Sequence, residues 1–178
     1  MINQIIKRIC YIIKRSKPGY LMVATLGTFL GISSITYLGY RYEVALLFPS
    51  LASSAIVLFA SPVSMTKVKC IVGGQLLSAL AGVTVYQLLG STWWSVSISV
   101  ALAMVLMDIT DTLHPPGGAT AFVAVISKQN YAFVLKPVSL GLGILILSAL
   151  VVQLLDLKRG YLKEGGIEVG KFSRTEDR

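Results

Sequence analysis

Long stretches of this chain carry almost no charged side chains, and their lengths predict helices that cross a membrane. A helix needs about 20 mostly apolar residues to span the hydrocarbon core of a bilayer. The runs that meet this length predict four long transmembrane helices, at Gly19–Tyr40, Val68–Gly90, Trp93–Thr112 and Pro137–Leu157. The pattern therefore predicts an all-α polytopic membrane protein.

Two further apolar segments are shorter and begin with proline. They run from Pro49 to Ser61 and from Pro115 to Ser127, and each covers roughly half to two thirds of a bilayer crossing. Proline suits the first turn of a helix because its missing N–H would have no partner there. The residue before proline prefers an extended backbone. The pattern thus predicts two half-helices that begin inside the membrane after an extended lead-in.

The two halves of the chain resemble each other when one is shifted by 66 residues along the other. The shift places Pro49 on Pro115, Ser54 on Thr120, and the Gln-Leu-Leu at 87–89 on the same triplet at 153–155. We therefore expect two three-element units, about 19–90 and 91–157, each a long helix, a half-helix and a long helix. If the half-helices cross the membrane, the units form an inverted repeat; if they re-enter, only the four long helices span.

Composition and charge support a membrane domain at 19–157 with polar ends. Hydrophobic residues make up 54% of the chain and charged residues 13%, against about 25% charged in soluble domains. The net charge of +8 comes mostly from the two ends of the chain, so the positive-inside rule places both termini in the cytoplasm. Charge that flanks apolar spans does not indicate nucleic-acid binding. We expect an integral protein of a bacterial inner (plasma) membrane.

The segments outside the membrane domain predict different roles. Residues 1–18 place isoleucines at helical spacing opposite lysines and arginines, which is typical of an amphipathic helix lying on anionic membrane lipids. The polar tail at 158–178 is predicted to be a mostly disordered cytoplasmic end. Small-residue patterns, Gly27-xxx-Gly31 and the stripe of Gly74, Ser78 and Gly82, favour close helix packing within the subunit or a dimer. We expect a homo-oligomer.

The polar centre of the sequence is Thr110–Phe122, which contains the only histidine, His114. The break at its two prolines and two glycines predicts exposed backbone N–H groups at a helix N-terminus, which favour a bound anion. The first unit offers serine hydroxyls at the equivalent place. The expected anion-binding residues are Ser50, Ser53, Ser54, His114, Pro115, Pro116, Gly117, Gly118, Ala119 and Thr120.

Three ionisable residues precede or enter this break at a spacing of three: Asp108, Asp111 and His114. They could support the loop, couple protons, or bind a divalent metal. No serine elbow, paired-histidine motif or cofactor loop accompanies them, so we expect neither an enzyme nor a cofactor. Gln75 and Gln87 need polar partners in an apolar helix, and interhelical hydrogen bonds are favoured over pore lining.

The blocks Pro49–Pro62, Ile71–Gly90 and Leu113–Phe122 resemble the HPP family of integral membrane proteins, named after the motif found here as His114-Pro115-Pro116. Cyanobacterial and plastid members are implicated in nitrite transport. The resemblance therefore implies a small-anion transporter, with nitrite as the leading candidate. For such a transporter the two predicted repeats suggest that one rocks against the other to alternate access. The family usually has histidine where this chain has Gln75. The alternatives are a cation or metal transporter using the three ionisable residues, a membrane-embedded enzyme, and a non-transporting subunit.

Overall fold

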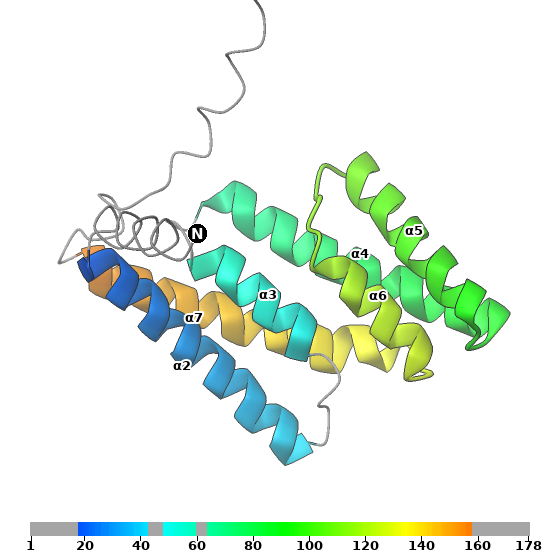
Figure 1. The fold of residues 1–178 in the computed structure, drawn as a ribbon, viewed down its shortest axis with the longest axis horizontal. Helices are drawn as coiled ribbons and strands as arrows, with labels where there is room; N and C mark the ends of the chain where they lie inside the picture. Colours follow the sequence, from blue (N-terminus) through cyan, green and yellow to red (C-terminus); the bar gives the residue numbers. More distant parts are fainter. Residues whose placement is uncertain (1–17, 43–47, 60–63, 158–178) are drawn as a thin grey trace, which may run out of the picture.

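The structure, a computed structural model, describes residues 18–42, 48–59 and 64–157, and these form helices without any strand (Figure 1). The predicted all-α class is confirmed for this part of the chain. The basic segment up to residue 17 and the tail from residue 158 lie outside it. The elements are α2 (Pro18–Tyr42), α3 (Phe48–Phe59), α4 (Met65–Leu89), α5 (Trp93–Ile109), α6 (Gly117–Ile126), the π-helix η2 (Val134–Val138) and α7 (Ser139–Leu157).

Two of these helices are long and apolar enough to cross a membrane. They cover Thr66–Leu89 and Val134–Leu154, with mean hydropathies of 1.6 and 2.2. The other apolar helices are shorter, at Met22–Tyr37, Pro49–Phe59, Trp93–Ile109 and Gly117–Ile126. The predicted four long spans are thus matched by two helices of spanning length in the described residues.

Local capping sets the tight connection between α4 and α5. α4 ends at Leu89 and is capped by Gly90, whose φ of +71° favours glycine. Two residues later the Thr92 hydroxyl accepts a hydrogen bond from the backbone N–H of Ser95, and the Ser95 side chain accepts one from the backbone N–H of Thr92. This reciprocal pair is a capping box, which starts α5. The predicted boundary between the two long helices is confirmed here.

α5 ends three residues before the predicted Thr112 because the chain turns left-handed at Asp111, with a φ of +52°. The N–H of Thr112 bonds the carbonyl of Met107 at 2.8 Å, and the N–H of Asp111 bonds that of Asp108 at 3.1 Å. This pair of bonds is a Schellman motif, which satisfies the last free carbonyls of the helix. The second half-helix begins at Gly117, just after the two prolines, rather than at Pro115.

The last long helix starts earlier than the predicted Pro137. Its first turn is the π-helix η2, which contains Pro137 and continues directly into α7. Proline has no N–H to donate to the preceding turn, and the hydroxyl of Ser139 donates to the carbonyl of Val134 at 2.8 Å. The wider π-turn and the hydrogen bond from Ser139 therefore allow the helix to continue past Pro137.

The helices pack as two bundles that do not follow the two sequence units. α2, α3 and α7 pack together as the first bundle, and α4, α5 and α6 pack more extensively as the second (Figure 1). Fewer contacts join the bundles, mainly α3 with α6 and α4 with η2. Four residues of the second bundle share one hydrophobic core with the first: Ile71, Ala79, Val83 and Ala124. Each predicted unit therefore gives its last long helix to the other bundle. α4, from the first unit, packs with α5 and α6, and α7, from the second unit, packs with α2 and α3.

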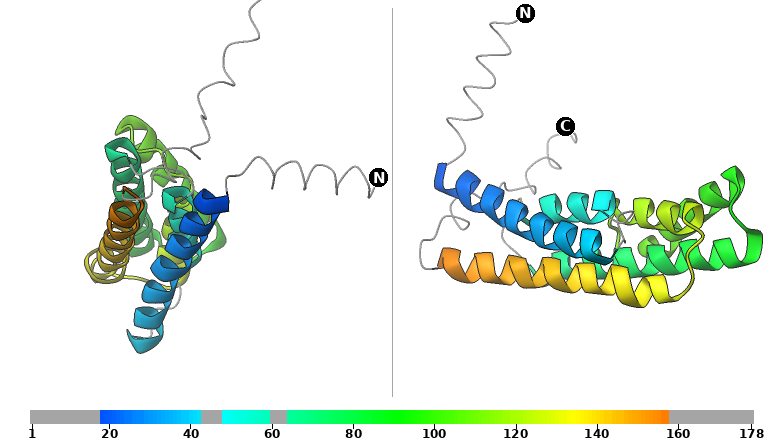
Figure 2. Two further views of the ribbon diagram at one scale, coloured as in Figure 1. Left: turned by 90° about the vertical axis from the view of Figure 1, so that its left-hand side faces the viewer. Right: turned by 90° about the horizontal axis from the view of Figure 1, so that it is seen from below.

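The two short helices meet at the centre of the molecule. Figures 1 and 2 show α3 and α6 end to end along the long axis, each lying beside the long helices of its own bundle. Hydrogen bonds join Ser50, in the first turn of α3, to Pro116 and Thr120 at the start of α6. Their N-terminal turns therefore face each other where the bundles touch.

Small residues allow the close approach of helices inside each bundle. A Cβ on Gly27 of α2 would lie 2.7 Å from the Phe59 ring of α3, and one on Gly82 of α4 would lie 2.6 Å from the carbonyl oxygen of Ala121 on α6. Such distances exclude any larger residue without displacement. The predicted packing role within the subunit is confirmed, and Gly27-xxx-Gly31 gives no support to an oligomer because it contacts the chain itself.

Candidate functional site

A buried cluster of uncharged polar side chains lies where the two bundles meet. Its members are 3% exposed or less, and we call them the polar cluster: Ser50, Ser54, Gln75, His114 and Thr120. The two serines belong to the first bundle, through α3. The other three belong to the second bundle, through α4, the segment before α6, and α6 itself. Every contact between these two groups therefore bridges the bundles.

Gln75 is the centre of the cluster. Its amide nitrogen donates to the hydroxyl oxygens of Ser50 and Ser54, at 2.8 Å each. Its amide oxygen accepts from the Thr120 hydroxyl in a short bond and lies 3.2 Å from the hydroxyl oxygen of Ser50. The amide thus uses both donor hydrogens and its oxygen accepts one hydrogen bond, so this buried group is paired. The predicted interhelical role of Gln75 is confirmed, whereas Gln87 lies exposed near the end of α4.

Ser50 joins the N-terminal turns of the half-helices directly. Its hydroxyl lies 2.7 Å from the carbonyl oxygen of Pro116 and 2.7 Å from the Thr120 hydroxyl. A carbonyl can only accept, so the bond to Pro116 fixes Ser50 as its donor. In the 66-residue register Ser50 is the counterpart of Pro116. Equivalent positions of the two sequence units therefore touch at the centre of the molecule.

His114 enters the cluster from the segment between α5 and α6. Its Nε2 atom lies 2.8 Å from the Ser54 hydroxyl, and that hydroxyl also lies 3.0 Å from the carbonyl of Ser50. The backbone carries His114 close to α4 because residue 74 is glycine. A Cβ there would lie 2.5 Å from the Cβ of His114.

Gly117 has a similar packing role one turn later. A Cβ at Gly117 would lie 2.6 Å from the Ser78 hydroxyl and 2.8 Å from the carbonyl oxygen of Gly74. The start of α6 therefore lies directly against the backbone of α4. This contact sets the position of Thr120, one turn further along α6, within reach of Gln75.

The predicted free backbone donors at the start of α6 are not found. The N–H groups of Gly117, Gly118 and Ala119 donate to the carbonyls of His114, Pro115 and Pro116, at 2.8, 3.1 and 3.2 Å. A tight first turn thus uses the donors that a helix start would otherwise leave open. The expectation that these N–H groups hold an anion in this conformation is therefore wrong. The hydrogen-bonding groups at this place are side chains.

The remaining predicted residues lie around the cluster. Ser53 is exposed and its hydroxyl donates to the carbonyl of Pro49 in its own helix, at 3.1 Å, so it is not part of the cluster. Pro115 is exposed, and Gly118 and Ala119 are half-buried. The structure thus brings together Ser50, Ser54, His114 and Thr120 from the predicted set and adds the Gln75 side chain as their hub.

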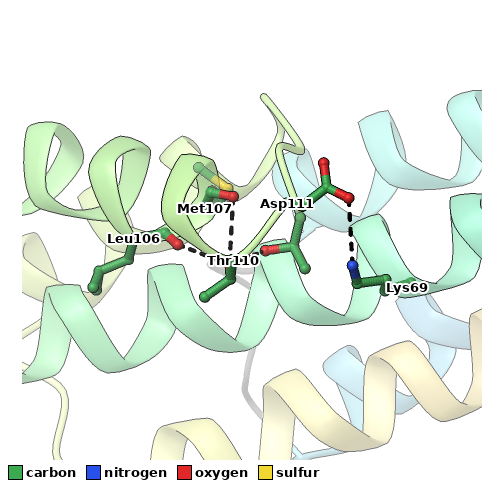
Figure 3. Close-up of polar contacts among 6 residues, drawn as sticks. Lys69, Leu106, Met107, Thr110 and Asp111 are labelled. Carbon is green, nitrogen blue, oxygen red and sulfur yellow. Dashed lines mark hydrogen bonds and ion pairs between the residues drawn. The ribbon is translucent and has the colours of Figure 1, made fainter.

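The three ionisable residues spaced by three do not form a site. α5 ends at Ile109 and the chain reverses at Asp111, so the helical spacing that would align them is lost. Asp108 and Asp111 are exposed and His114 is buried. Figure 3 shows Asp111 turned toward Lys69 on α4, with 3.5 Å between its carboxylate and the ammonium nitrogen. Within the described part of the chain no group of His, Cys, Asp or Glu could hold a metal.

Comparison with known proteins adds the family. The sequence profile described as "HPP, transmembrane region" matches residues 13–162. This chain belongs to the HPP transmembrane family. The HPP chain is similar to two proteins named as transmembrane proteins from Dictyostelium discoideum, each 33% identical over 149 residues that cover 76% of the chain. It spans about half the length of these curated relatives, 52% and 48%. No solved structure matches it.

In this HPP chain the family motif lies at the cluster itself. His114 contacts Ser54, and the carbonyl of Pro116 accepts from Ser50. The sequence pattern marked Gln75 only as a polar residue that needs a partner. Its neighbour Gly74 was a further signal, because a small residue on an apolar helix allows a second segment, here His114, to pack close to it.

Proposed function

We propose that this chain transports a small inorganic anion, with nitrite as the leading candidate, and that the anion binds between the bundles at the polar cluster. The observation that carries the proposal is a fully buried set of hydrogen-bonding side chains where two half-helices meet. Polar groups in a membrane interior are costly and tend to be functional. The family resemblance implies nitrite transport, and nitrite belongs to the same class of substrate.

The chemistry of the cluster favours a small acceptor. Three hydroxyls and one amide offer rotatable or fixed donors, and no acidic side chain contributes to this set. A carboxylate would repel an anion, whereas hydroxyl and amide donors can replace part of its hydration shell. The facing N-terminal ends of α3 and α6 add positive dipole ends on both sides. A small monovalent anion suits such a site better than a cation.

The dimensions of the half-helices fit a site near the midplane. At 1.5 Å per residue, α3 and α6 rise about 18 and 15 Å, and together they match a hydrocarbon core of about 30 Å. We propose that the two units are an inverted repeat whose half-helices meet halfway across the bilayer. Both termini would then lie on the cytoplasmic side of a bacterial inner membrane.

We further propose that access alternates by movement between the two bundles rather than between the two sequence units. In the conformation described, the polar groups of the cluster bond one another. A bound anion must therefore replace the bonds that Ser50 and Ser54 make to the second bundle. If the two bundles separate on one side of the membrane, these hydrogen-bond donors would become accessible to an anion from that side. The contacts between the bundles, which are fewer than those within each bundle, support this division.

The experiment that tests the proposal is nitrite uptake into proteoliposomes, with nitrate, formate and chloride as competitors. Ser50→Ala and Thr120→Val each remove one hydroxyl that joins the bundles at 2.7 Å. We expect each change to reduce saturable uptake by about tenfold or more, because one hydrogen bond to a charged group contributes about 1.5–3 kcal/mol.

Ser53→Ala is the matched control, since it removes an exposed hydroxyl from the same helix turn that bonds only its own helix. This variant should transport at the wild-type rate. Equal uptake in all three variants, each inserted in equal amount, would disprove the proposed site. Absence of flux for every anion in the folded wild-type protein would disprove the function.

A further inference from the structure

One ring nitrogen of His114 has no hydrogen-bond partner among the residues that the structure describes. Nε2 bonds Ser54, whereas Nδ1 makes no bond to any of these residues. The side chain is 3% exposed. A buried polar atom without a partner is rare in folded proteins and calls for an explanation.

The hydrogen bonds around Ser54 are all satisfied by the His114 tautomer that carries its hydrogen on Nε2. Its hydroxyl oxygen accepts from the Gln75 amide at 2.8 Å, and the carbonyl of Ser50 is 3.0 Å away as an acceptor. If the hydroxyl donates to that carbonyl, its second lone pair accepts from Nε2–H of His114, and every hydrogen in this group is used. Nδ1 then carries a lone pair with no donor directed at it. This atom is a vacant place for one proton.

The groups around His114 are uncharged, so a proton on Nδ1 would add a positive charge that an anion could pair with. From α3 it meets Ser54, and from α4 it lies against Gly74, beside which Met107 and the carbonyl of Thr112 also lie. None of these groups is charged or titratable near neutral pH. The titratable residues nearest in sequence, Asp108 and Asp111, are exposed. Within the part of the chain described, only a protonated His114 would place a positive charge in the cluster.

We infer that His114 binds a proton at Nδ1 together with the anion, so that the protein carries the two as a neutral pair in one-to-one symport. This inference rests on the proposed function. An anion alone in a buried site is costly because its charge is unpaired. An imidazolium beside it removes that cost, so anion binding raises the proton affinity of His114 and the proton raises the anion affinity equally. The proton enters from one aqueous face and leaves with the anion at the other.

The test measures uptake of ¹⁵N-labelled nitrite by the whole chain in proteoliposomes. Because nitrous acid crosses a bilayer without a protein, the flux into protein-free vesicles is subtracted. With an alkaline interior, the wild-type protein should accumulate nitrite about tenfold for each pH unit, as one-to-one coupling requires. A potential imposed with potassium and valinomycin should leave this uptake unchanged, because a neutral pair moves no net charge.

The decisive variant is His114→Gln. The glutamine amide can reach Ser54 as Nε2 does but cannot take up a proton. It should still exchange internal for external nitrite, lose accumulation driven by the pH gradient, and become sensitive to membrane potential. Asp108→Asn is the matched control and should accumulate nitrite normally, because its carboxylate is exposed.

The outcomes separate this inference from the function itself. A wild-type flux that responds to potential, or accumulation retained in His114→Gln, would overturn proton coupling and leave anion transport standing. A folded His114→Gln protein without any exchange would also overturn it, because the ring would then belong to the anion site. A wild-type protein without flux or exchange would disprove the proposed function instead.

Discussion

Replacing Gln75 with methionine is expected to lower the free energy of unfolding by about 2–4 kcal/mol and to abolish nitrite uptake. Methionine keeps the length of the side chain but removes the three hydrogen bonds that the Gln75 amide makes, to Ser50, Ser54 and Thr120. Interhelical bonds in membrane proteins contribute about 0.6 kcal/mol each, and buried groups left without partners cost a further 1–3 kcal/mol. Denaturation of the purified protein in a detergent titration would measure the loss.

Gln87 provides the control on the same helix. Its side chain is exposed and its one bond, to the carbonyl of Gln129, is 3.5 Å long. Gln87→Met should therefore change the free energy of unfolding by less than about 0.5 kcal/mol. If both variants unfold at the same detergent concentration as the wild type, the cluster is not a determinant of stability.

Gly117→Ala is expected to have the second large effect, a loss of about 1–3 kcal/mol of stability from overpacking. The added methyl group would lie 2.8 Å from the carbonyl oxygen of Gly74, which belongs to the helix backbone and cannot turn away. α6 would have to move off α4, and Thr120 would leave the reach of Gln75. The melting temperature in detergent, followed by size-exclusion chromatography, would report this change.

Gly118→Ala tests the same turn without the collision. A methyl group there would lie 3.6 Å from the Val100 side chain, which is an ordinary contact. Alanine also favours a helix over glycine by up to about 1 kcal/mol, so this variant should be as stable as the wild type or slightly more stable. A Gly118→Ala protein that melts well below Gly117→Ala would contradict the packing described for α6.

The helical organisation could be predicted from the sequence because apolar run length and proline position act locally. The two short helices that begin beside prolines and the turn before Trp93 follow from such patterns. The sequence also placed Ser50 and Thr120 in one site, although not in direct contact as the structure has them. Helix ends were less predictable. α5 ends at a left-handed aspartate, Asp111, where a glycine would have been the recognisable signal, and a π-turn carries η2 through Pro137.

The site was only half predictable, for a physical reason. Sequence spacing associated three serines of α3 with the segment around His114, of which Ser50 and Ser54 contact it and Ser53 does not. It assigned the hydrogen bonding to backbone N–H groups. Those groups are used within the first turn of α6, and that turn depends on three-dimensional packing against Gly74. Spacing also grouped Asp108, Asp111 and His114, since a helix was assumed to continue where the chain in fact reverses.

The exchange of helices between the bundles has a consequence for how the protein is made. The second bundle is contiguous in sequence, so α4, α5 and α6 can find one another as soon as they leave the ribosome. α2 and α3 are synthesised first but receive their third helix, α7, last. The earliest part of the membrane domain must therefore wait in the bilayer through almost the whole of translation, and the C-terminal helix is what completes it.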